Sequence, residues 1–409
     1  MAVLRPEEAR LRRLVQAHDR WRGREVFNLL PSENALSPTA RRYLSSDLAG
    51  RYTLPTKEPF LGEEIPNSYA GTRYTDEIQA LADSAAERVF RARFATTRML
   101  SGHVAAMSAL AMLLPKGSKY LAIAPENGGY DGYGPGFLPA LLGYHVRPLP
   151  TSSAGNRLDA EATAEEIRRE RPQAVVLGQS FFLFPYPLRE IAEAAHAQDA
   201  LVLYDASHVM GLIAGRQFQD PLKEGADVVF GSTHKSFPGP QGGLLMTDRS
   251  DLFQQIDSAV VWRTIDNAHW NRIAGLAQTL LELERFGSEY AETVVANARA
   301  LGLALDDRDL RLIARDEGFT RSHQLHMDRP EIARRFGVAP GALARRWEPQ
   351  GLITDMIGRL GTAEITRLGL RPKDMPRLAD LMIRAADGDR SARRDIRAWR
   401  QTFQALRFL

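Results

Sequence analysis

The stretch LVLYDASHVMGLIAGRQFQDPLKEGADVVFGSTHKSFPGPQGG, residues 201–243, contains two short apolar runs that each lead into residues with chemical function. Asp205 closes the run LVLYD, and Lys235 follows the run DVVFG after a Ser-Thr-His sequence. Short apolar strands alternating with helical segments are typical of parallel sheets, which bind ligands at the carboxyl ends of their strands. We therefore expect Asp205 and Lys235 to lie close together at one edge of a sheet.

The same alternation continues along most of the chain. It predicts an α/β fold, with a mostly parallel seven-stranded sheet covered by helices on both faces, and a smaller α+β C-terminal domain. We expect an N-terminal helical arm at 1–25, a large domain at 26–262, and a long linking helix with the small domain at 263–409. The expected strands are 96–100, 120–123, 145–149, 174–178, 201–205, 227–231 and 243–247, and the expected helices are 6–21, 160–171, 188–198 and a long one from 269 onward.

The composition excludes several classes of function. The chain has no cysteine, which excludes disulfides, thiolate metal sites and a cysteine nucleophile. The net charge is only +3, and the arginine-rich stretch 389–401 is interrupted by acids, which favours a solvated helix face over a nucleic-acid surface. No apolar run is long enough to span a bilayer. We expect a cytoplasmic enzyme with no metal, nucleic-acid or membrane partner.

Lysine is rare in this chain, since only six of the 53 basic residues are lysines. Arginine replaces lysine as a surface cation, but not as an amine that must deprotonate and attack a carbonyl. An aspartate, a lysine and nearby hydroxyl groups at strand ends are what pyridoxal phosphate (PLP) requires: a partner for its ring nitrogen, an amine for its aldehyde and donors for its phosphate. In isolation, Asp205 and Lys235 would fit an ordinary ion pair, but the flanking His208, Ser232 and His234 favour the cofactor. The glycine-rich stretch 128–136 matches no dinucleotide-binding or P-loop motif.

Six segments, in order along the chain, resemble the serine hydroxymethyltransferase family of fold-type I PLP enzymes. The resemblance covers most of the chain and implies that the large domain binds PLP. The segments are LLPSEN (29–34), SGHVAAMSAL (101–110), GGYDGYG (128–134), YDASHVMGLIAG (204–215), STHKSFPGPQGG (232–243) and IGRLGTAEITRLG (357–369).

The resemblance implies a role for each matching residue. Lys235 would hold PLP covalently, and Ser32 and Arg359 would bind the substrate α-carboxylate. Tyr52 would reach the phosphate from the neighbouring subunit, which implies a homodimer with shared active sites. The other implied cofactor-binding residues are Asp205, His208, Ser180, Gly102, His103, Tyr130, His234, Ser232 and Asn267, and the implied catalytic residues are Lys235, Tyr130, Tyr69 and Glu64. Taken singly, Ser32 also fits a helix cap, Arg359 a surface cation and His208 a core histidine.

Several positions depart from the family pattern. Tyr130 stands where the ring-stacking histidine is usual, His103 where serine is usual, and Asp266–Asn267 where a glycine pair is usual, which resembles the archaeal branch. The segment between Tyr52 and Tyr69 is longer than in the family, and Leu54 falls at the position of the catalytic glutamate. Glu58, Glu63 and Glu64 are candidates to replace that glutamate, with Glu64 preferred. Use of tetrahydrofolate stays open.

The resemblance implies cleavage or formation of the Cα–Cβ bond of serine, threonine or a related amino acid, in specialised biosynthesis. Hydroxymethyl transfer, aldol and transaldol chemistry all belong to this class. An alternative is a different PLP reaction on a larger amino-acid-containing substrate: β-elimination, decarboxylation-linked deamination or transamination. A non-catalytic PLP-binding protein is disfavoured, because Lys235, Asp205 and Arg359 are all present.

Overall fold

The computed structural model describes residues 5–54, 67–152 and 157–409. It forms two compact units, one of residues 34–292 with the last two residues of the chain, and one of residues 1–33 with 293–407. The N-terminal segment therefore belongs to the same unit as most of the C-terminal part.

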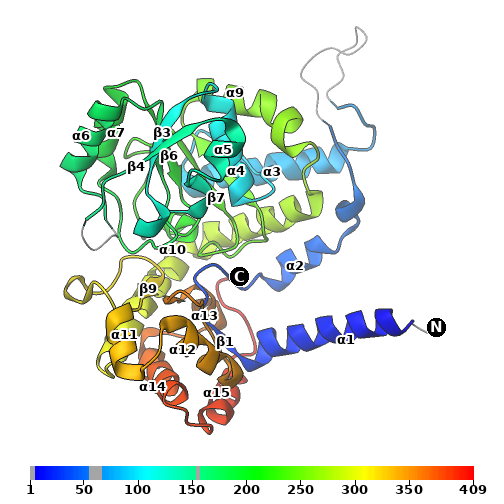
Figure 1. The fold of residues 1–409 in the computed structure, drawn as a ribbon. Helices are drawn as coiled ribbons and strands as arrows, with labels where there is room; N and C mark the ends of the chain where they lie inside the picture. Colours follow the sequence, from blue (N-terminus) through cyan, green and yellow to red (C-terminus); the bar gives the residue numbers. More distant parts are fainter. Residues whose placement is uncertain (1–4, 55–66, 153–156) are drawn as a thin grey trace. The chain divides into compact units, whose positions relative to one another are not determined.

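The larger unit is built on a seven-stranded sheet with the strand order β2-β8-β7-β6-β5-β3-β4. The strands from β4 to β7 in that order are parallel, whereas β8 runs antiparallel to both of its neighbours. The predicted α/β fold with a mostly parallel seven-stranded sheet is confirmed (Figure 1). The strands are β2 (Phe94–Thr96), β3 (Lys119–Ala122), β4 (His145–Pro148), β5 (Ala174–Leu177), β6 (Leu201–Asp205), β7 (Val228–Ser232) and β8 (Gly243–Thr247).

Helices pack on this sheet because alternate strand residues point to opposite faces. One face buries Tyr120, Val176, Leu203 and Phe230 against α4 and α9. Elsewhere α7 packs on β6 with α6 beside it, and α3 packs on β2. The helices of this unit are α2 (Pro38–Leu44), α3 (Arg73–Phe90), α4 (Gly102–Leu113), α5 (Leu138–Leu142), α6 (Ala160–Glu170), α7 (Leu188–His196), α8 (Met210–Ala214), α9 (Ser250–Val260) and the first part of α10 (Trp270–Asp306).

The expected strand at 96–100 is the least accurate of the predicted elements. The structure places β2 at Phe94–Thr96, because the backbone N–H and hydroxyl of Thr97 both bond to Oδ1 of Asp83, at 2.8 and 2.7 Å. These bonds take the chain out of the sheet and toward the start of α4. The apolar residues after Thr97 are thus buried as a connection and not as a strand.

The smaller unit has two pairs of short strands and a helical core. Strand β1 (Phe27–Asn28) pairs in parallel with β10 (Leu352–Ile353), and β9 (Gln324–His326) pairs antiparallel with β11 (Arg359–Gly361). A buried apolar cluster that includes Trp347 and Trp399 joins them to the helices. The helices are α1 (Pro6–Arg20), α11 (Arg329–Phe336), α12 (Pro340–Trp347), α13 (Ala363–Leu368), α14 (Met375–Ala386), α15 (Ala392–Arg400) and the last part of α10.

Helix α1 has no buried residue, although it carries Leu11, Leu14 and Val15. These apolar side chains are 64, 58 and 52% exposed. Among the described helices, α1 and α10 included, none is long and apolar enough to cross a membrane.

Candidate active site

A pocket opens in the larger unit where strands β5, β6 and β7 end. Its cavity volume is about 50 Å³. Its position matches the general rule that parallel sheets bind ligands beyond the carboxyl ends of their strands. The pocket is lined by Gly102, His103, Tyr130, Gln179, Ser180, Asp205, Ser207, His208, Ser232 and Lys235.

Asp205 is the last residue of β6, and its carboxylate is held by two donors. Tyr133 donates its phenol hydrogen to Oδ2 at 2.7 Å, and the backbone N–H of Ser207 donates to Oδ1 at 2.9 Å. Gly178 packs directly behind, since a Cβ there would lie 2.8 Å from Cβ of Asp205. The carboxylate is therefore fixed in orientation at the edge of the pocket, as the partner of a cationic ring nitrogen must be.

Lys235 lies in the turn after β7, with its Nζ 3.4 Å from Nε2 of His208. Asn34 holds the backbone of this turn, since its Nδ2 donates to the carbonyl of Lys235 at 2.8 Å and lies within 2.8 Å of the Tyr290 hydroxyl. Asn34 belongs to the LLPSEN segment, 201 residues away in sequence. No signal within one segment could have identified this contact.

The start of α4 forms a close approach to the end of β7. Ser101 caps the helix by accepting a 3.0 Å hydrogen bond from the Val104 N–H. A Cβ on Gly102 would lie 2.3 Å from the hydroxyl oxygen of Ser232, so only glycine fits without a shift. Ser232 in turn donates its backbone N–H to the hydroxyl of Ser207 at 3.0 Å. Backbone N–H groups at the start of a helix suit a phosphate group.

Two further pocket residues contact each other at the mouth of the site. Nδ1 of His103 lies 2.9 Å from the hydroxyl of Tyr130. Burial, together with the charges of Asp205 and Asp131, raises the pKa of Tyr130. The phenol is therefore protonated at neutral pH, and it donates this hydrogen bond in the His103 tautomer that carries its proton on Nε2.

Two buried nitrogen atoms test whether the site fits PLP. Within the described part of the chain, neither Nε2 of Gln179 nor Nδ1 of His234 has a hydrogen-bond partner. Gln179 is only 5% exposed and lines the pocket. Burial and the charge of Lys235 lower the pKa of His234 to about 4, so this histidine is neutral. An amine, a fixed carboxylate, a helix start and an orphaned amide donor together suit a polar, anionic cofactor of the PLP kind.

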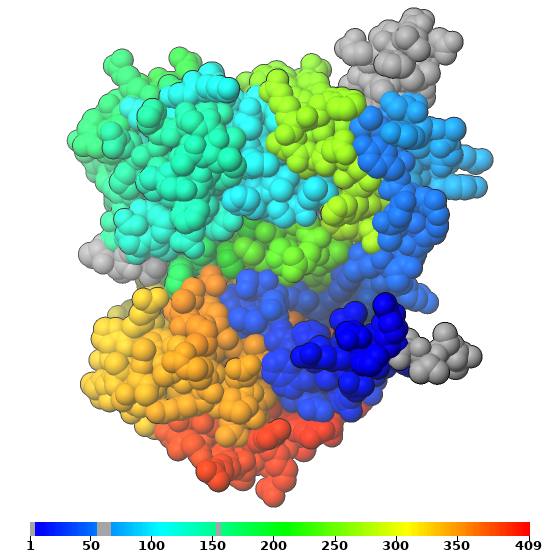
Figure 2. Space-filling view, turned by 45° about the vertical axis from the view of Figure 1, so that its right-hand side comes forward, coloured from blue at the N-terminus to red at the C-terminus, as the bar shows by residue number. Residues whose placement is uncertain are grey.

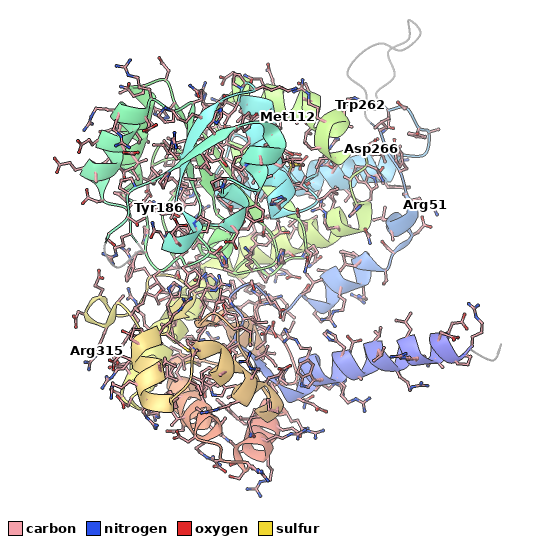
Figure 3. All side chains as sticks on the ribbon, in the orientation of Figure 1. Arg51, Met112, Tyr186, Trp262, Asp266 and Arg315 are labelled. Atoms are coloured by element: carbon pink, nitrogen blue, oxygen red, sulfur yellow. The ribbon has the colours of Figure 1, made fainter. Side chains whose placement is uncertain are left out.

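Tyr52, Tyr69 and Asn267 do not line this pocket in the part of the chain that the structure describes. The rings of Tyr52 and Tyr69 pack edge to face, with their centroids 5.1 Å apart, and are 41 and 48% exposed. Tyr52 donates to Oδ2 of Asp266 at 2.9 Å, and Asn267 donates to the carbonyl of Arg51 at 3.2 Å. Figure 2 shows blue and yellow-green segments side by side, and Figure 3 labels Arg51 on the first and Asp266 on the second.

Asp266 has a φ of 55° and a ψ of −107°, a backbone conformation that favours glycine. A glycine pair is expected here from the family pattern, and this chain keeps the turn without it. This backbone conformation places the Asp266 carboxylate where it accepts the hydrogen bond from Tyr52.

Ser32 and Arg359 both lie in the smaller unit, on neighbouring segments. The backbone N–H of Gly361 donates to the carbonyl of Leu29 at 2.7 Å. A Cβ on Gly361 would lie 2.5 Å from Cα of Pro31, so the two segments are in close contact. Arg359 is only 8% exposed, and its Nε lies 2.6 Å from Oδ2 of Asp355. The alternative interpretation of Arg359 as a surface cation is therefore wrong. The helix-cap interpretation of Ser32 is wrong as well, because α2 begins at Pro38 and is capped by Ser37.

The candidates to replace the family glutamate, Glu58, Glu63 and Glu64, lie outside the described residues. Leu54, which the resemblance predicts at the glutamate position, is 9% exposed and belongs to the apolar cluster that includes Met99 and Ile265. Its side chain therefore contributes to the core. Sequence reasoning did not identify Gln179, Ser207, Tyr133 or Asn34 as site residues.

A seven-stranded sheet of this order, with a lysine and an aspartate at adjacent strand ends, defines a fold-type I PLP-dependent enzyme. Comparison with known proteins agrees. Residues 6–382 match the family model of serine hydroxymethyltransferase. The serine hydroxymethyltransferase of Methanopyrus kandleri is 37% identical over 97% of this chain and 94% of its own, and that of Methanocella arvoryzae is 35% identical over 94 and 92%. The chain belongs to the serine hydroxymethyltransferase family, and the predicted resemblance and the predicted PLP cofactor are confirmed.

A solved structure agrees on the fold. The L-threonine transaldolase of Pseudomonas fluorescens superposes with a TM-score of 0.86 at 24% sequence identity, covering 98% of this chain and 93% of that one. Membership of the serine hydroxymethyltransferase family makes this chain a PLP-dependent transferase or lyase with Cα–Cβ chemistry on amino acids.

Proposed function

We propose that the protein cleaves and forms the Cα–Cβ bond of a β-hydroxy-α-amino acid without tetrahydrofolate, as an aldolase or transaldolase. The observation that carries the proposal is the combination of a complete lysine and aspartate set in the pocket with the burial of Leu54 in the core. The PLP-binding groups are present, whereas the position that the resemblance assigns to the family glutamate would hold the apolar side chain of Leu54. Serine, threonine or a larger relative would be the substrate, in specialised biosynthesis.

PLP, when bound, supplies an aldehyde that takes up the substrate amine and a protonated ring that accepts electrons from the α-carbon. The chain's own residues orient these groups. Asp205, fixed by Tyr133 and Ser207, would keep the ring nitrogen protonated. Lys235 would hold the aldehyde until the substrate amine displaces it. The start of α4 at Gly102, with Ser232 and His234, would bind the phosphate, and Ser180 and His208 would lie at the ring.

The substrate carboxylate would be bound by Arg359 and Ser32. The guanidinium is planar and can form two parallel hydrogen bonds to a carboxylate. Asp355 lies 2.6 Å from Nε and fixes one edge of this group. Burial and the charge of Arg359 lower the pKa of the adjacent His326, so this histidine adds no competing charge at neutral pH.

We further propose a homodimer in which each subunit completes the other's active site. Tyr52, Tyr69 and Asn267 would reach the phosphate and the substrate of the partner, since Tyr52 and Tyr69 are exposed and none of the three lines the described pocket of its own chain. Trp262, which is 66% exposed, and the apolar residues of α1 supply further exposed apolar surface.

Mixing two inactive variants tests the shared site. Lys235→Ala and Tyr52→Ala, refolded or co-expressed together, should regain activity, because one site of each heterodimer then carries both wild-type residues. Size-exclusion chromatography with light scattering gives the oligomeric state. A monomer, or a mixture as inactive as its components, would contradict the shared site.

The proposed reaction is tested by product analysis. The purified protein with PLP should release glycine and the matching aldehyde, in equal amounts, from at least one of L-serine, L-threonine and β-phenylserine. The rate should not depend on added tetrahydrofolate. Pyruvate and ammonia, carbon dioxide, or a keto acid as the product would each identify one of the alternative reactions. Glycine formation that requires tetrahydrofolate would overturn the folate-independent part.

Covalent attachment tests the lysine. Lys235→Ala should lose all cofactor that borohydride reduction fixes to the wild type, with the fold retained by circular dichroism. Lys223→Ala is the matched control, because Lys223 lies at the surface with its Nζ 2.5 Å from Oδ2 of Asp248. Fixed cofactor on the Lys235 variant would contradict the assignment.

A further inference from the structure

The hydrogen bond between His103 and Tyr130 joins the interior of the pocket to the solvent. Both residues line the pocket, and the two atoms in contact are Nδ1 and the phenol oxygen, 2.9 Å apart. His103 is exposed, whereas Tyr130 is only partly accessible. A proton arriving at the phenol therefore has a direct route to a basic group in contact with water.

The ring of Tyr130 is held on two sides. It packs edge to face on Tyr133, with centroids 5.3 Å apart, and a Cβ on Gly132 would lie 2.4 Å from its Cε1. Tyr133 is itself bound to Asp205. The phenol oxygen is thus fixed in place relative to the carboxylate that partners the cofactor ring.

The other ionisable groups that line the pocket are already engaged. Asp205 accepts hydrogen bonds from Tyr133 and Ser207, and Lys235 lies 3.4 Å from His208. Cleavage of a Cα–Cβ bond beside a β-hydroxyl requires a base for the hydroxyl proton. Among the described lining residues, the His103–Tyr130 pair remains for this task.

We propose that Tyr130 is the catalytic residue that takes the proton of the substrate β-hydroxyl, and that His103 takes the phenol's own proton in the same step. This inference rests on the proposed function. The cofactor, when bound, would accept the electron pair of the Cα–Cβ bond. The electron pair of the O–H bond forms the aldehyde carbonyl, the hydroxyl proton bonds to the phenol oxygen, and the phenol proton bonds to Nδ1 of His103. Bond formation runs the same transfers in reverse.

The kinetic test uses Tyr130→Phe, which keeps the ring and removes the hydroxyl. Loss of a positioned acid–base group slows reactions by roughly 10²- to 10⁴-fold, so kcat for aldehyde release should fall by that factor, with KM little changed. Exchange of the α-hydrogen of glycine with deuterated solvent involves no β-hydroxyl, so the same substitution should slow it far less than it slows aldehyde release. The control is Tyr144→Phe, which removes a buried hydroxyl that bonds the carbonyls of Leu110 and Leu114, outside the site.

His103 acts through Tyr130 and needs a test that a structural role would not satisfy. His103→Ala should lose aldehyde release and regain part of it when imidazole is added, because the position is open to solvent. His103→Asn keeps a hydrogen-bond acceptor but cannot take up a proton, so it should stay slow.

A measurement without cofactor or turnover tests the pair itself. In the apo-protein labelled with ¹⁵N-histidine, one resonance assigned to His103 should show an accepting Nδ1, and Tyr130→Phe should shift it. His145, exposed on β4, is an internal reference. An unshifted resonance would overturn the inference.

The outcomes separate this inference from the proposed function. If the wild type releases no aldehyde from any β-hydroxy amino acid, the proposed function fails. If the wild type releases aldehyde and Tyr130→Phe does so equally fast, or if Tyr130→Phe loses glycine exchange to the same extent, the proton transfer by this pair is wrong and the reaction stands.

Discussion

The phenol of Tyr133 donates a 2.7 Å hydrogen bond to the carboxylate of Asp205, at the end of the strand that leads to the active site. Tyr133 is buried, with 1% of its surface exposed, and stands only three residues after Tyr130. The glycine-rich turn therefore contributes to the site twice, with one tyrosine at the pocket wall and one beneath the carboxylate.

We expect Tyr133→Phe to weaken both the fold and PLP binding. A hydrogen bond to a charged group contributes about 1.5–3 kcal/mol, so the free energy of unfolding at neutral pH should fall by about this much, and PLP affinity should fall about tenfold or more. Urea unfolding and fluorescence titration with PLP measure the two effects. Tyr186→Phe is the control, because within the described residues the buried hydroxyl of Tyr186 (labelled in Figure 3) has no partner. Equal effects of the two substitutions would contradict the role of Tyr133.

Gly102→Ala tests the close approach of α4 and β7. The new Cβ would lie 2.3 Å from the hydroxyl oxygen and 2.8 Å from the backbone nitrogen of Ser232. Overpacking of this kind costs about 1–3 kcal/mol, and the helix start must move away from the phosphate position. A lower melting temperature and weaker PLP binding should result. Gly136→Ala, where a Cβ meets nothing within 4 Å, should change neither.

A second substitution at the contact sharpens this test. Ser232→Ala combined with Gly102→Ala removes the hydroxyl but leaves the backbone nitrogen, so part of the lost stability should return. If none of the lost stability returns, the clash of the new Cβ does not involve the Ser232 hydroxyl.

The sequence predicted the parts of this protein that depend on local patterns. Apolar runs ending in Asp205 and before Lys235 located β6 and the turn after β7, because a buried strand imposes its pattern on its own residues. Contacts between remote segments left no such pattern. The bond from Asn34 to the Lys235 backbone spans 201 residues, and it arises only when the whole unit folds.

Burial explains the other differences between prediction and structure. Leu54 could be aligned with the family glutamate, but only packing against Met99 and its neighbours identifies it as a core residue. Gln179 is one of many polar residues in the sequence, and only its 5% exposure and orphaned amide nitrogen mark it as a candidate ligand-binding residue.

Arg359→Ala tests the carboxylate site. Truncating one partner of a buried charge pair costs about 2–5 kcal/mol, so the dissociation constant of an amino-acid substrate should rise about thirtyfold or more. Titrations with an amino acid and with its carboxamide distinguish loss of carboxylate binding from damage to the fold. The substitution should weaken binding of the amino acid and leave the weak binding of the amide unchanged.

The control for Arg359 is Arg308→Ala, which removes a surface ion pair with Asp380 at 2.6 Å and should leave substrate binding intact. If Arg359→Ala weakens binding of the amide as strongly as binding of the amino acid, Arg359 supports the fold and does not bind the carboxylate.

Glu364 gives the smaller unit a pH dependence that can be measured. Burial raises the pKa of Glu364 to about 7 from its ordinary 4.5, against the opposing effects of a hydrogen bond from Asn28 and the charge of Arg22. The Asn28 amide donates to Oε2 of Glu364 at 2.7 Å. Between these two pKa values the folded chain holds a proton that the unfolded chain has lost. The free energy of unfolding therefore decreases as the pH rises through this window, by roughly 3 kcal/mol in all.

Glu364→Gln keeps an acceptor for Asn28 and cannot ionise, so it should remove this decrease. Relative to the wild type, its free energy of unfolding should rise by roughly 2–3 kcal/mol between pH 5 and pH 8 in urea titrations. Glu77→Gln, at a side chain that is 64% exposed, should run parallel to the wild type across the same range. A Glu364 variant that also runs parallel would mean that the carboxyl group is already ionised at pH 5, because water reaches it in the folded chain.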